Sequence, residues 1–363
     1  MDALVMYLLL VFVLSIVFGA VAQTSQFCPV GGLREVMSNQ GAHRLWTYLA
    51  AIAVAVMGVT LIEFFQWVDL TGTKPNYRSE EFAYGRYILG GLIFGFGMVL
   101  SAGCGMRNLV RVGQGSLKAV LLVLVMAITA YIMTKTSVYA DLFMPIVAPF
   151  SVSFNELGSQ DLGSLFSNLN NDLASNRLVL ALIIALPILY FALKNPQFRQ
   201  PRYILSALVI GLAVTAGFYI TGAEMGQALI SEAEFMEVPP LGLGTQSYSF
   251  AAPMADTVYA AFNLGGLSVI TFGVVAVIGL PIGALLSSVV RKEFKMELGF
   301  SSRRDVLLSV LGAVLVGIGS VLAMGCSVGH GLTGISTLAL GSFLALFSIA
   351  LGAFVGIRLE ARL

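Results

Sequence analysis

Long apolar stretches that recur along the whole chain constrain this sequence more than any other feature. A helix needs about 20 mostly apolar residues to cross a lipid bilayer, and this chain supplies such stretches repeatedly. Only 11% of its 363 residues are charged, against about 25% in soluble domains. We therefore expect an all-α polytopic membrane protein that forms a single transmembrane domain over residues 1–363. Hydropathy predicts nine spans, at about residues 3–22, 45–68, 86–102, 116–137, 177–193, 203–222, 264–290, 304–324 and 340–359.

The basic residues are distributed unevenly between the connecting segments, and this orients the chain. If the N-terminus is outside, 15 of the 20 Lys and Arg residues face inward. The two long connections, 138–176 and 223–256, contain acidic residues but no Lys or Arg. Because cytoplasmic segments are enriched in Lys and Arg, we predict a protein of the bacterial inner membrane with its C-terminus in the cytoplasm. The chain opens without a positive segment, so we expect residues 3–22 to be a retained helix.

Composition also argues against several classes of function. The net charge of +1, without a basic tail, indicates no nucleic-acid partner. Three dispersed cysteines without a C-x-x-C pair argue against a disulfide framework and against structural zinc. Two histidines cannot supply paired axial haem ligands, and no P-loop is visible. We therefore expect no metal, no cofactor and no enzymatic activity.

An internal repeat links the two halves of the chain. Gly95, Gly97, Gly103 and Cys104 recur, always 222 residues later, as Gly317, Gly319, Gly325 and Cys326. The first copy lies on a span predicted to run inward and the second on one predicted to run outward. We therefore predict two inverted repeats, about 1–137 and 203–363, with 138–202 as the linker, and a substrate path at their interface. The alternative is that these glycines serve close helix packing alone.

Each cysteine lies where an apolar helix ends and a short segment begins. Cys28 precedes Pro29, Cys104 lies between Gly103 and Gly105, and Cys326 follows Gly325. A helix that starts at a cysteine points free N–H groups and the positive end of its dipole toward the sulfur, which favours an anion. A thiol is a weak donor and a weak acceptor, and weak successive sites permit passage. The sequence thus predicts an anion path along the three cysteines, although a buried cysteine can also act as a small hydrophobe.

Several polar residues near these motifs allow two interpretations. Arg107, three residues after Cys104, can attract an anion or simply follow the positive-inside rule, and the same holds for Arg34 and Arg111. His330 fits a hydrogen-bonded polar residue better than a proton relay. Glu63 is expected to be an interfacial acid. The segment 247–256 takes the place of the Cys28 region in the second half but has no cysteine. Its Ser and Tyr hydroxyls either replace the cysteine as polar ligands or only satisfy backbone groups.

The motifs around the three cysteines resemble those of the YeeE/YedE family of sulfur-transport membrane proteins. The residues that carry the likeness are Phe27-Cys28-Pro29-Val30-Gly31, the stretch from Ser101 to Arg111, Met324-Gly325-Cys326-Ser327-Val328-Gly329-His330-Gly331, Ser249 to Pro253, and Ser336 to Phe343. The resemblance implies thiosulfate uptake through an hourglass of mostly nine spans with additional short helices. It also implies that Cys28, Cys104 and Cys326 pass the anion along by transient S–H···S contacts, and that a cytosolic TusA-like sulfur carrier receives the sulfur.

Three other functions stay open at this point. A related branch of the family is associated with selenium metabolism, so the substrate can be a selenium compound. A membrane thiol oxidoreductase or sulfurtransferase would form a persulfide on a cysteine, but such enzymes usually need a nearby resolving cysteine, and none is near in sequence. A subunit that does not transport would use its glycines for helix packing only.

Overall fold

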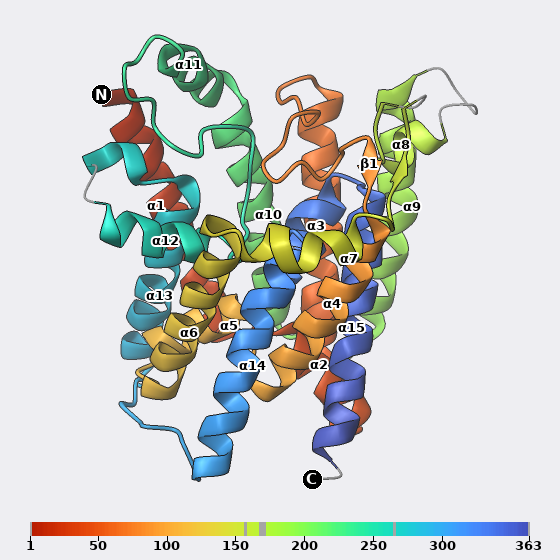
Figure 1. The fold of residues 1–363 in the computed structure, drawn as a ribbon. Coiled ribbons are helices and arrows are strands. Elements are labelled where there is room, and N and C mark those ends of the chain that lie inside the picture. The colour runs from red at the N-terminus through yellow and green to blue at the C-terminus, as the bar shows by residue number, and fades with distance from the viewer. Residues whose placement is uncertain (1, 156–157, 167–171, 264–265, 362–363) are drawn as a thin grey trace.

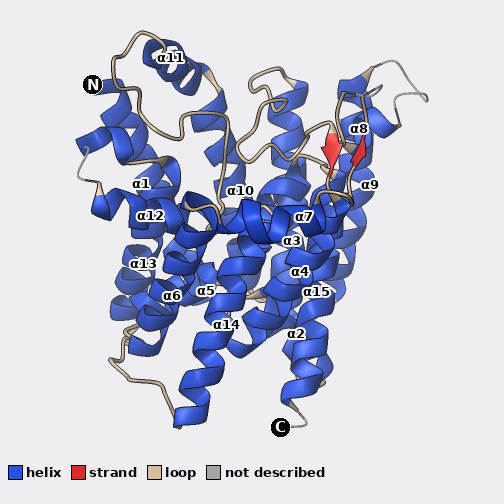
Figure 2. Ribbon diagram, in the orientation of Figure 1, coloured by secondary structure: helices blue, strands red, loops and turns tan. Residues whose placement is uncertain are grey.

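The fold is an all-α bundle, as the sequence predicts. A computed structural model describes residues 2–155, 158–166, 172–263 and 266–361. Within them, the only sheet is an antiparallel pair of two-residue strands, β1 (Glu81–Phe82) and β2 (Val152–Ser153). Figure 2 shows this pair at the end of the bundle opposite to the C-terminus.

The nine expected spans are present in the described part of the chain, by length and apolar composition. They are α1 (Asp2–Thr24), α3 (His43–Phe64), α4 (Tyr84–Leu100), α6 (Leu117–Lys135), α9 (Leu173–Lys194), α10 (Pro201–Gly222), α13 (Phe272–Val290), α14 (Arg303–Leu322) and α15 (Leu340–Glu360). Figure 1 places the two termini at opposite ends of the bundle, as an odd number of spans requires. We call the end that carries the N-terminus the N face and the opposite end the C face.

The seventh span begins later than hydropathy predicts. The expected span covered 264–290, of which 264–265 lie outside the described residues. The helix α13 starts at Phe272, after a short 3-10 turn, η3 (Gly266–Val269). Thr271 is the N-cap of α13, because its hydroxyl accepts a hydrogen bond from the N–H of Val274 at 3.2 Å. Hydropathy does not detect this boundary, since the residues before the cap are also apolar.

Short helices complete the bundle. A short helix follows each of the three cysteines: α2 (Pro29–Met37), α5 (Gly105–Gly113) and residues 327–336, whose centre is the π-helix η4 (Gly329–Gly334). The connections contribute η1 (Tyr139–Phe143), α7 (Met144–Val147), α8 (Leu162–Leu165), α11 (Glu224–Ala233) and α12 (Ala252–Phe262). In Figure 1, η1 and α7 run across the front of the bundle, over α14 and α4.

Helices α4 and α14 cross closely through glycines. A Cβ atom added to Gly97 would lie 2.8 Å from the carbonyl oxygen of Gly312, and one added to Gly312 would lie 2.8 Å from that of Gly97. A Cβ atom on Gly319 would likewise lie 2.8 Å from the carbonyl oxygen of Gly90. The offset of 222 residues maps Gly90 onto Gly312 and Gly97 onto Gly319, so it exchanges the two helices. This pairing supports the predicted inverted repeat, which stays a prediction, and it also shows that these glycines do serve close packing.

A buried cluster of charges fastens the connections at the N face to the segment after Cys326. Arg78 donates from Nε to the carbonyl of Thr337 at 2.8 Å and pairs with Glu63. Arg177 bridges Glu63 and Asp161, with 2.9 Å in each ion pair. Glu63 lies at the end of α3, and its side chain is only 11% exposed; its position at the membrane interface stays a prediction. Two guanidinium groups neutralise it, which makes its burial tolerable.

Candidate functional site

The same backbone turn precedes each of the three cysteines. The residue two positions before the cysteine has a left-handed conformation, with φ of 51°, 56° and 66° at Gln26, Ala102 and Met324. The N–H of the next residue donates to the carbonyl five residues earlier, in the pairs Phe27–Ala22 (3.0 Å), Gly103–Met98 (2.9 Å) and Gly325–Ser320 (2.9 Å). These are the bonds of a Schellman-type helix end. The same turn therefore precedes all three cysteines, including Cys28, where the sequence repeat has no counterpart.

Each cysteine then begins the short helix that follows it. Its carbonyl accepts the N–H four residues later, from Gly32 (3.0 Å), Asn108 (3.0 Å) and His330 (2.8 Å). The sulfur of Cys28 accepts the N–H of Gly31 at 3.3 Å, and that of Cys326 accepts the N–H of Gly329 at 3.4 Å. The Cys104 sulfur makes no cap bond of that geometry, but the backbone N–H of Arg107 lies near it. All three thiols thus lie at the amino end of a helix, where N–H groups and the helix dipole favour negative charge.

The fold brings the three cysteines into one buried region. All are free thiols, and none is more than 4% exposed. The side chains of Cys28 and Cys326 both lie within electrostatic range of the Cys104 thiol. The Tyr48 ring lies near Cys104 and Cys326, and its hydroxyl donates to the carbonyl of Ser327 at 2.6 Å. Cys104 is therefore the member that connects the other two.

The three predicted site glycines make room around the cysteines. Gly103 has φ of +153°, which a side chain would strain, and an added Cβ would lie 2.8 Å from Cγ of Arg107. A Cβ on Gly105 would lie 2.8 Å from the methyl of Met254. A Cβ on Gly325 would lie 2.8 Å from the ring of His330. Each glycine lets a neighbouring segment pack against the turn that carries a cysteine.

His330 is an anchor for the turn before Cys326. It is fully buried, with Nε2 at 2.7 Å from the carbonyl oxygen of Ala323 and Nδ1 at 3.1 Å from the hydroxyl of Ser342. A carbonyl only accepts, so Nε2 donates and Nδ1 accepts from Ser342. Both ring nitrogens are then occupied, which favours the hydrogen-bonded interpretation over a proton relay.

Arg107 directs positive charge at the cysteines. Its guanidinium lies within electrostatic range of Cys28 and Cys104. One terminal nitrogen is buried and has no hydrogen-bond partner among the described residues. Arg34 differs, because its guanidinium pairs with Glu360 at 2.7 Å. A buried donor without an acceptor is costly, so Arg107 is suited to receive an anion.

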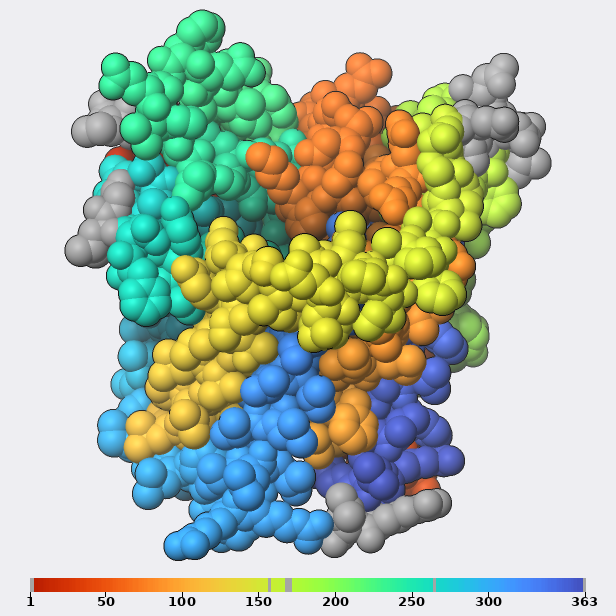
Figure 3. Space-filling model, in the orientation of Figure 1, coloured from red at the N-terminus to blue at the C-terminus, as the bar shows by residue number. Residues whose placement is uncertain are grey.

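A small cavity adjoins Cys326. It lies against Gly105, Phe250 and Met254 and has a volume of about 10 Å³. A cavity of about 10–15 Å³ holds one water, so this one is too small for a polyatomic anion. Figure 3 shows a notch in the N face between the 65–83 and 223–250 segments.

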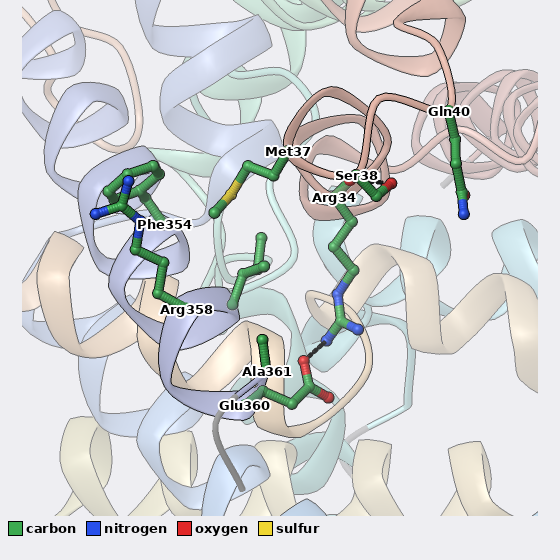
Figure 4. Close-up of a pocket in the computed structure, with 9 residues that line it drawn as sticks. Arg34, Met37, Ser38, Gln40, Phe354, Arg358, Glu360 and Ala361 are labelled. Atoms are coloured by element: carbon green, nitrogen blue, oxygen red, sulfur yellow. Dashed lines mark hydrogen bonds and ion pairs between the residues drawn. The ribbon is translucent and has the colours of Figure 1, made fainter.

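At the C face, a pocket of about 760 Å³ lies between the ends of α2 and α15. Arg34 and Glu360 point toward one another across it, and Arg358 lies at its edge (Figure 4).

Four residues that surround Cys326 are not among the site residues that the sequence predicts. Tyr77 lies near its thiol, Tyr48 lies nearby, and Ser249 and Ser327 are buried in the same region. Ser327 adjoins a cysteine and Ser249 lies in the segment that replaces the Cys28 region, so both carried a signal. Tyr48 and Tyr77 carried none, because their proximity arises only on folding.

Comparison with known proteins agrees with this arrangement. A family model described as sulphur transport matches residues 24–355. The thiosulfate transporter TsuA of Spirochaeta thermophila is 26% identical over 340 residues, or 92% of this chain and 93% of that protein. TsuA of Escherichia coli is 24% identical over 332 residues, or 86% and 83%. The probable transporter YedE of Salmonella typhimurium is 30% identical over 98 residues, or 27% and 22%. Because the family match spans most of the chain and includes all three cysteines, the protein belongs to the sulphur-transport family, the YeeE/YedE family that its motifs resemble.

Proposed function

We propose that this protein imports thiosulfate, or a closely related small sulfur-containing anion, by passing it between the thiols of Cys326, Cys104 and Cys28. The observation that carries the proposal is the convergence in one buried region of three cysteines, each of which follows the same backbone turn and begins a short helix. Two relatives that align with most of the chain are named thiosulfate transporters, which supports the choice of substrate.

The chemistry of each step follows from what a thiol can do. Its S–H group donates weakly to the terminal sulfur of the anion, and the helix N–H groups offset the negative charge. No covalent bond forms, so the anion leaves each cysteine easily. Arg107 would hold the anion where it approaches Cys28, because its guanidinium lies near Cys28 and Cys104. The site glycines and His330 keep the turns in place.

Direction and driving force follow from the proposed orientation, with the N face outside the bacterial inner membrane and the C face in the cytoplasm. Inward movement of a dianion opposes the membrane potential, at about 2.3 kcal/mol per charge per 100 mV. Uptake then needs either a coupled ion or rapid removal of the product. A cytosolic TusA-like sulfur carrier that collects sulfur at the C face would provide that removal.

Uptake of radiolabelled thiosulfate tests the proposal. Cells that lack other thiosulfate importers would express the wild type, Cys28→Ala, Cys104→Ala, Cys326→Ala or Arg107→Gln at equal levels. We expect each cysteine variant to lose most uptake and Arg107→Gln to raise KM. The matched control is Arg358→Gln, because Arg358 is exposed at the C face, and it should behave as wild type. A wild type that takes up none, even with its carrier present, would redirect the proposal to another sulfur or a selenium anion.

A sulfurtransferase is the second candidate, and one observation favours it. Cys28 and Cys326 both lie near Cys104, so the lack of a nearby resolving cysteine in the sequence no longer argues against it. A thiolate would attack the outer sulfur of thiosulfate, form a cysteine persulfide and release sulfite. Mass spectrometry of the purified protein after exposure to thiosulfate decides: a persistent persulfide supports the enzyme, and unmodified thiols support transport.

A further inference from the structure

Three hydroxyl groups gather beside Cys326 from separate parts of the chain. We call Tyr77, Ser249 and Ser327 the hydroxyl cluster. All three are at most 7% exposed. A Cβ atom added to Gly329 would lie 2.8 Å from Oγ of Ser249 and 3.3 Å from the Tyr77 hydroxyl, so both touch this glycine. Its N–H donates to the sulfur of Cys326, which places the hydroxyls within one helical turn of the thiol.

Two members of the hydroxyl cluster are not fully hydrogen-bonded. The oxygens of Tyr77 and Ser327 are buried and make no hydrogen bond of acceptable geometry to any described residue. The Ser249 hydroxyl lies near that of Tyr77, and the Cys104 thiol lies near the Ser327 hydroxyl. The buried Tyr48 hydroxyl differs, because it donates to a carbonyl at 2.6 Å. Buried hydroxyls normally find a partner, so the cluster has capacity for a ligand.

The hydroxyl cluster is also neutral. Burial raises the pKa of Tyr77 far above its ordinary value, and the nearby Cys326 raises it further, so the phenol keeps its proton. The nearest guanidinium from the same connection, Arg78, is occupied by Glu63 and the Thr337 carbonyl. Neutral donors bind an anion more weakly than charged ones do, which suits a station that must release its cargo.

We infer that Tyr77, Ser249 and Ser327 form an oxyanion subsite, which holds the oxygen atoms of the entering anion while Cys326 contacts its terminal sulfur. The inference rests on the proposed function and adds to it the class and orientation of the substrate. The anion carries a tetrahedral oxygen-bearing end, as thiosulfate and sulfate do, and its sulfur end leads toward Cys104. Arg107 then binds the anion that the neutral subsite releases, on the other side of Cys104.

Direct binding to the purified protein tests the subsite. Radiolabelled thiosulfate would be titrated against the wild type, Tyr77→Phe, Ser249→Ala and Ser327→Ala, with sulfate and hydrosulfide as competitors. The matched control is Tyr87→Phe. The Tyr87 ring lies 5.8 Å from that of His330, as the Tyr77 ring does, but its hydroxyl faces Gln160.

We expect Tyr77→Phe and Ser327→Ala to weaken thiosulfate binding about threefold to tenfold each, the effect of one neutral hydrogen bond. Competition by sulfate should weaken in parallel, whereas competition by hydrosulfide, which has no oxygens, should not change. Tyr87→Phe should bind as wild type. Thermal unfolding would verify that each variant is folded. If Tyr77→Phe does not fold, Ser327→Ala, which removes a single oxygen, carries the test.

Each contrary outcome has its own meaning. If the wild type binds thiosulfate and every variant binds equally well, the subsite is overturned and the proposed function stands. A parallel loss of hydrosulfide competition would show general disruption and also overturn the subsite. A wild type that binds no thiosulfate overturns the subsite and the proposed function together.

Discussion

At the scale of single residues, the backbone before each cysteine carries a recurring strain. Gln26, Ala102 and Met324 all have positive φ, although a left-handed conformation costs an ordinary residue about 1–2 kcal/mol. Glycine would avoid that cost, yet none of the three positions uses it. Strain of this kind persists where the surrounding structure enforces it, often at functional sites. Here it aligns each thiol with the start of a new helix.

Ala102→Gly should therefore stabilise the protein. The substitution removes the strain at φ of 56°, and we expect a gain of up to about 1 kcal/mol, measured by unfolding in detergent micelles. Ala350→Gly is the matched control, because Ala350 is exposed within α15, where glycine should cost about 1 kcal/mol. Equal destabilisation by both substitutions would show that Ala102 is not strained.

At the scale of elements, the crossing of α4 and α14 positions two of the three cysteine turns. Each helix ends in one of these turns, before Cys104 or Cys326, and close glycine contacts set the distance between the two. The contacts are reciprocal, because Gly97 meets the backbone of Gly312 and Gly312 meets that of Gly97. A shift of either helix would thus move both turns relative to one another.

A double-mutant cycle tests this reciprocity. Gly97→Ala and Gly312→Ala should each destabilise the protein by about 1–3 kcal/mol, because the new methyl meets backbone at under 3 Å. The double variant should lose less stability than the sum of the two single losses. The first methyl group already pushes the helices apart, so the second meets less resistance. The control pair is Gly97→Ala with Gly217→Ala. Gly217 lies on α10 and packs against Ser247, so the effects of these two substitutions should be additive. Additivity in both pairs would contradict a shared contact.

At the scale of the whole molecule, the charge cluster joins connections that are distant in sequence. Asp161 accepts from Arg177 at 2.9 and 3.0 Å and from the hydroxyl of Ser164 at 2.6 Å. Its backbone also bridges to Ala339, just before α15. The cluster therefore fastens the connection between α7 and α9 over the segment that follows Cys326.

The pH dependence of stability should reveal this cluster. Burial alone raises the pKa of Asp161, but the hydrogen bonds and charge of Arg177, with the charge of Arg78, hold it well below its usual range. The ordinary pKa of Asp is about 3.9, so this contribution is complete above about pH 4 and is lost as the pH falls further.

Asp161→Asn should remove that acid-dependent loss and also lower stability at neutral pH, by about 3–5 kcal/mol, because Arg177 keeps its charge but loses a partner. Unfolding in detergent between pH 7 and about 3 measures both effects. Asp172→Asn is the control, because Asp172 is an exposed cap of α9 and Asn caps a helix equally well. Identical pH profiles for Asp161→Asn and wild type would contradict this role.

The sequence by itself determined the nine spans, the opposite faces of the two termini, the helix breaks at the three cysteines and the family. These features depend on local hydrophobicity and on glycine and proline at fixed positions, and bilayer thickness converts apolar length directly into spans. Hydropathy did not predict the late start of α13, because a single threonine cap decides that boundary.

Only the tertiary structure decided what surrounds the cysteines. Cys28 and Cys326 are almost 300 residues apart, and both lie near Cys104 because three copies of one turn point into the same space. Tyr77 reaches Gly329 from a distant part of the chain, and Glu63 pairs with Arg177, which lies 114 residues later. A local pattern specifies where a helix begins and ends, but contacts between distant segments follow from how glycine-lined helices pack, which no short stretch of sequence contains.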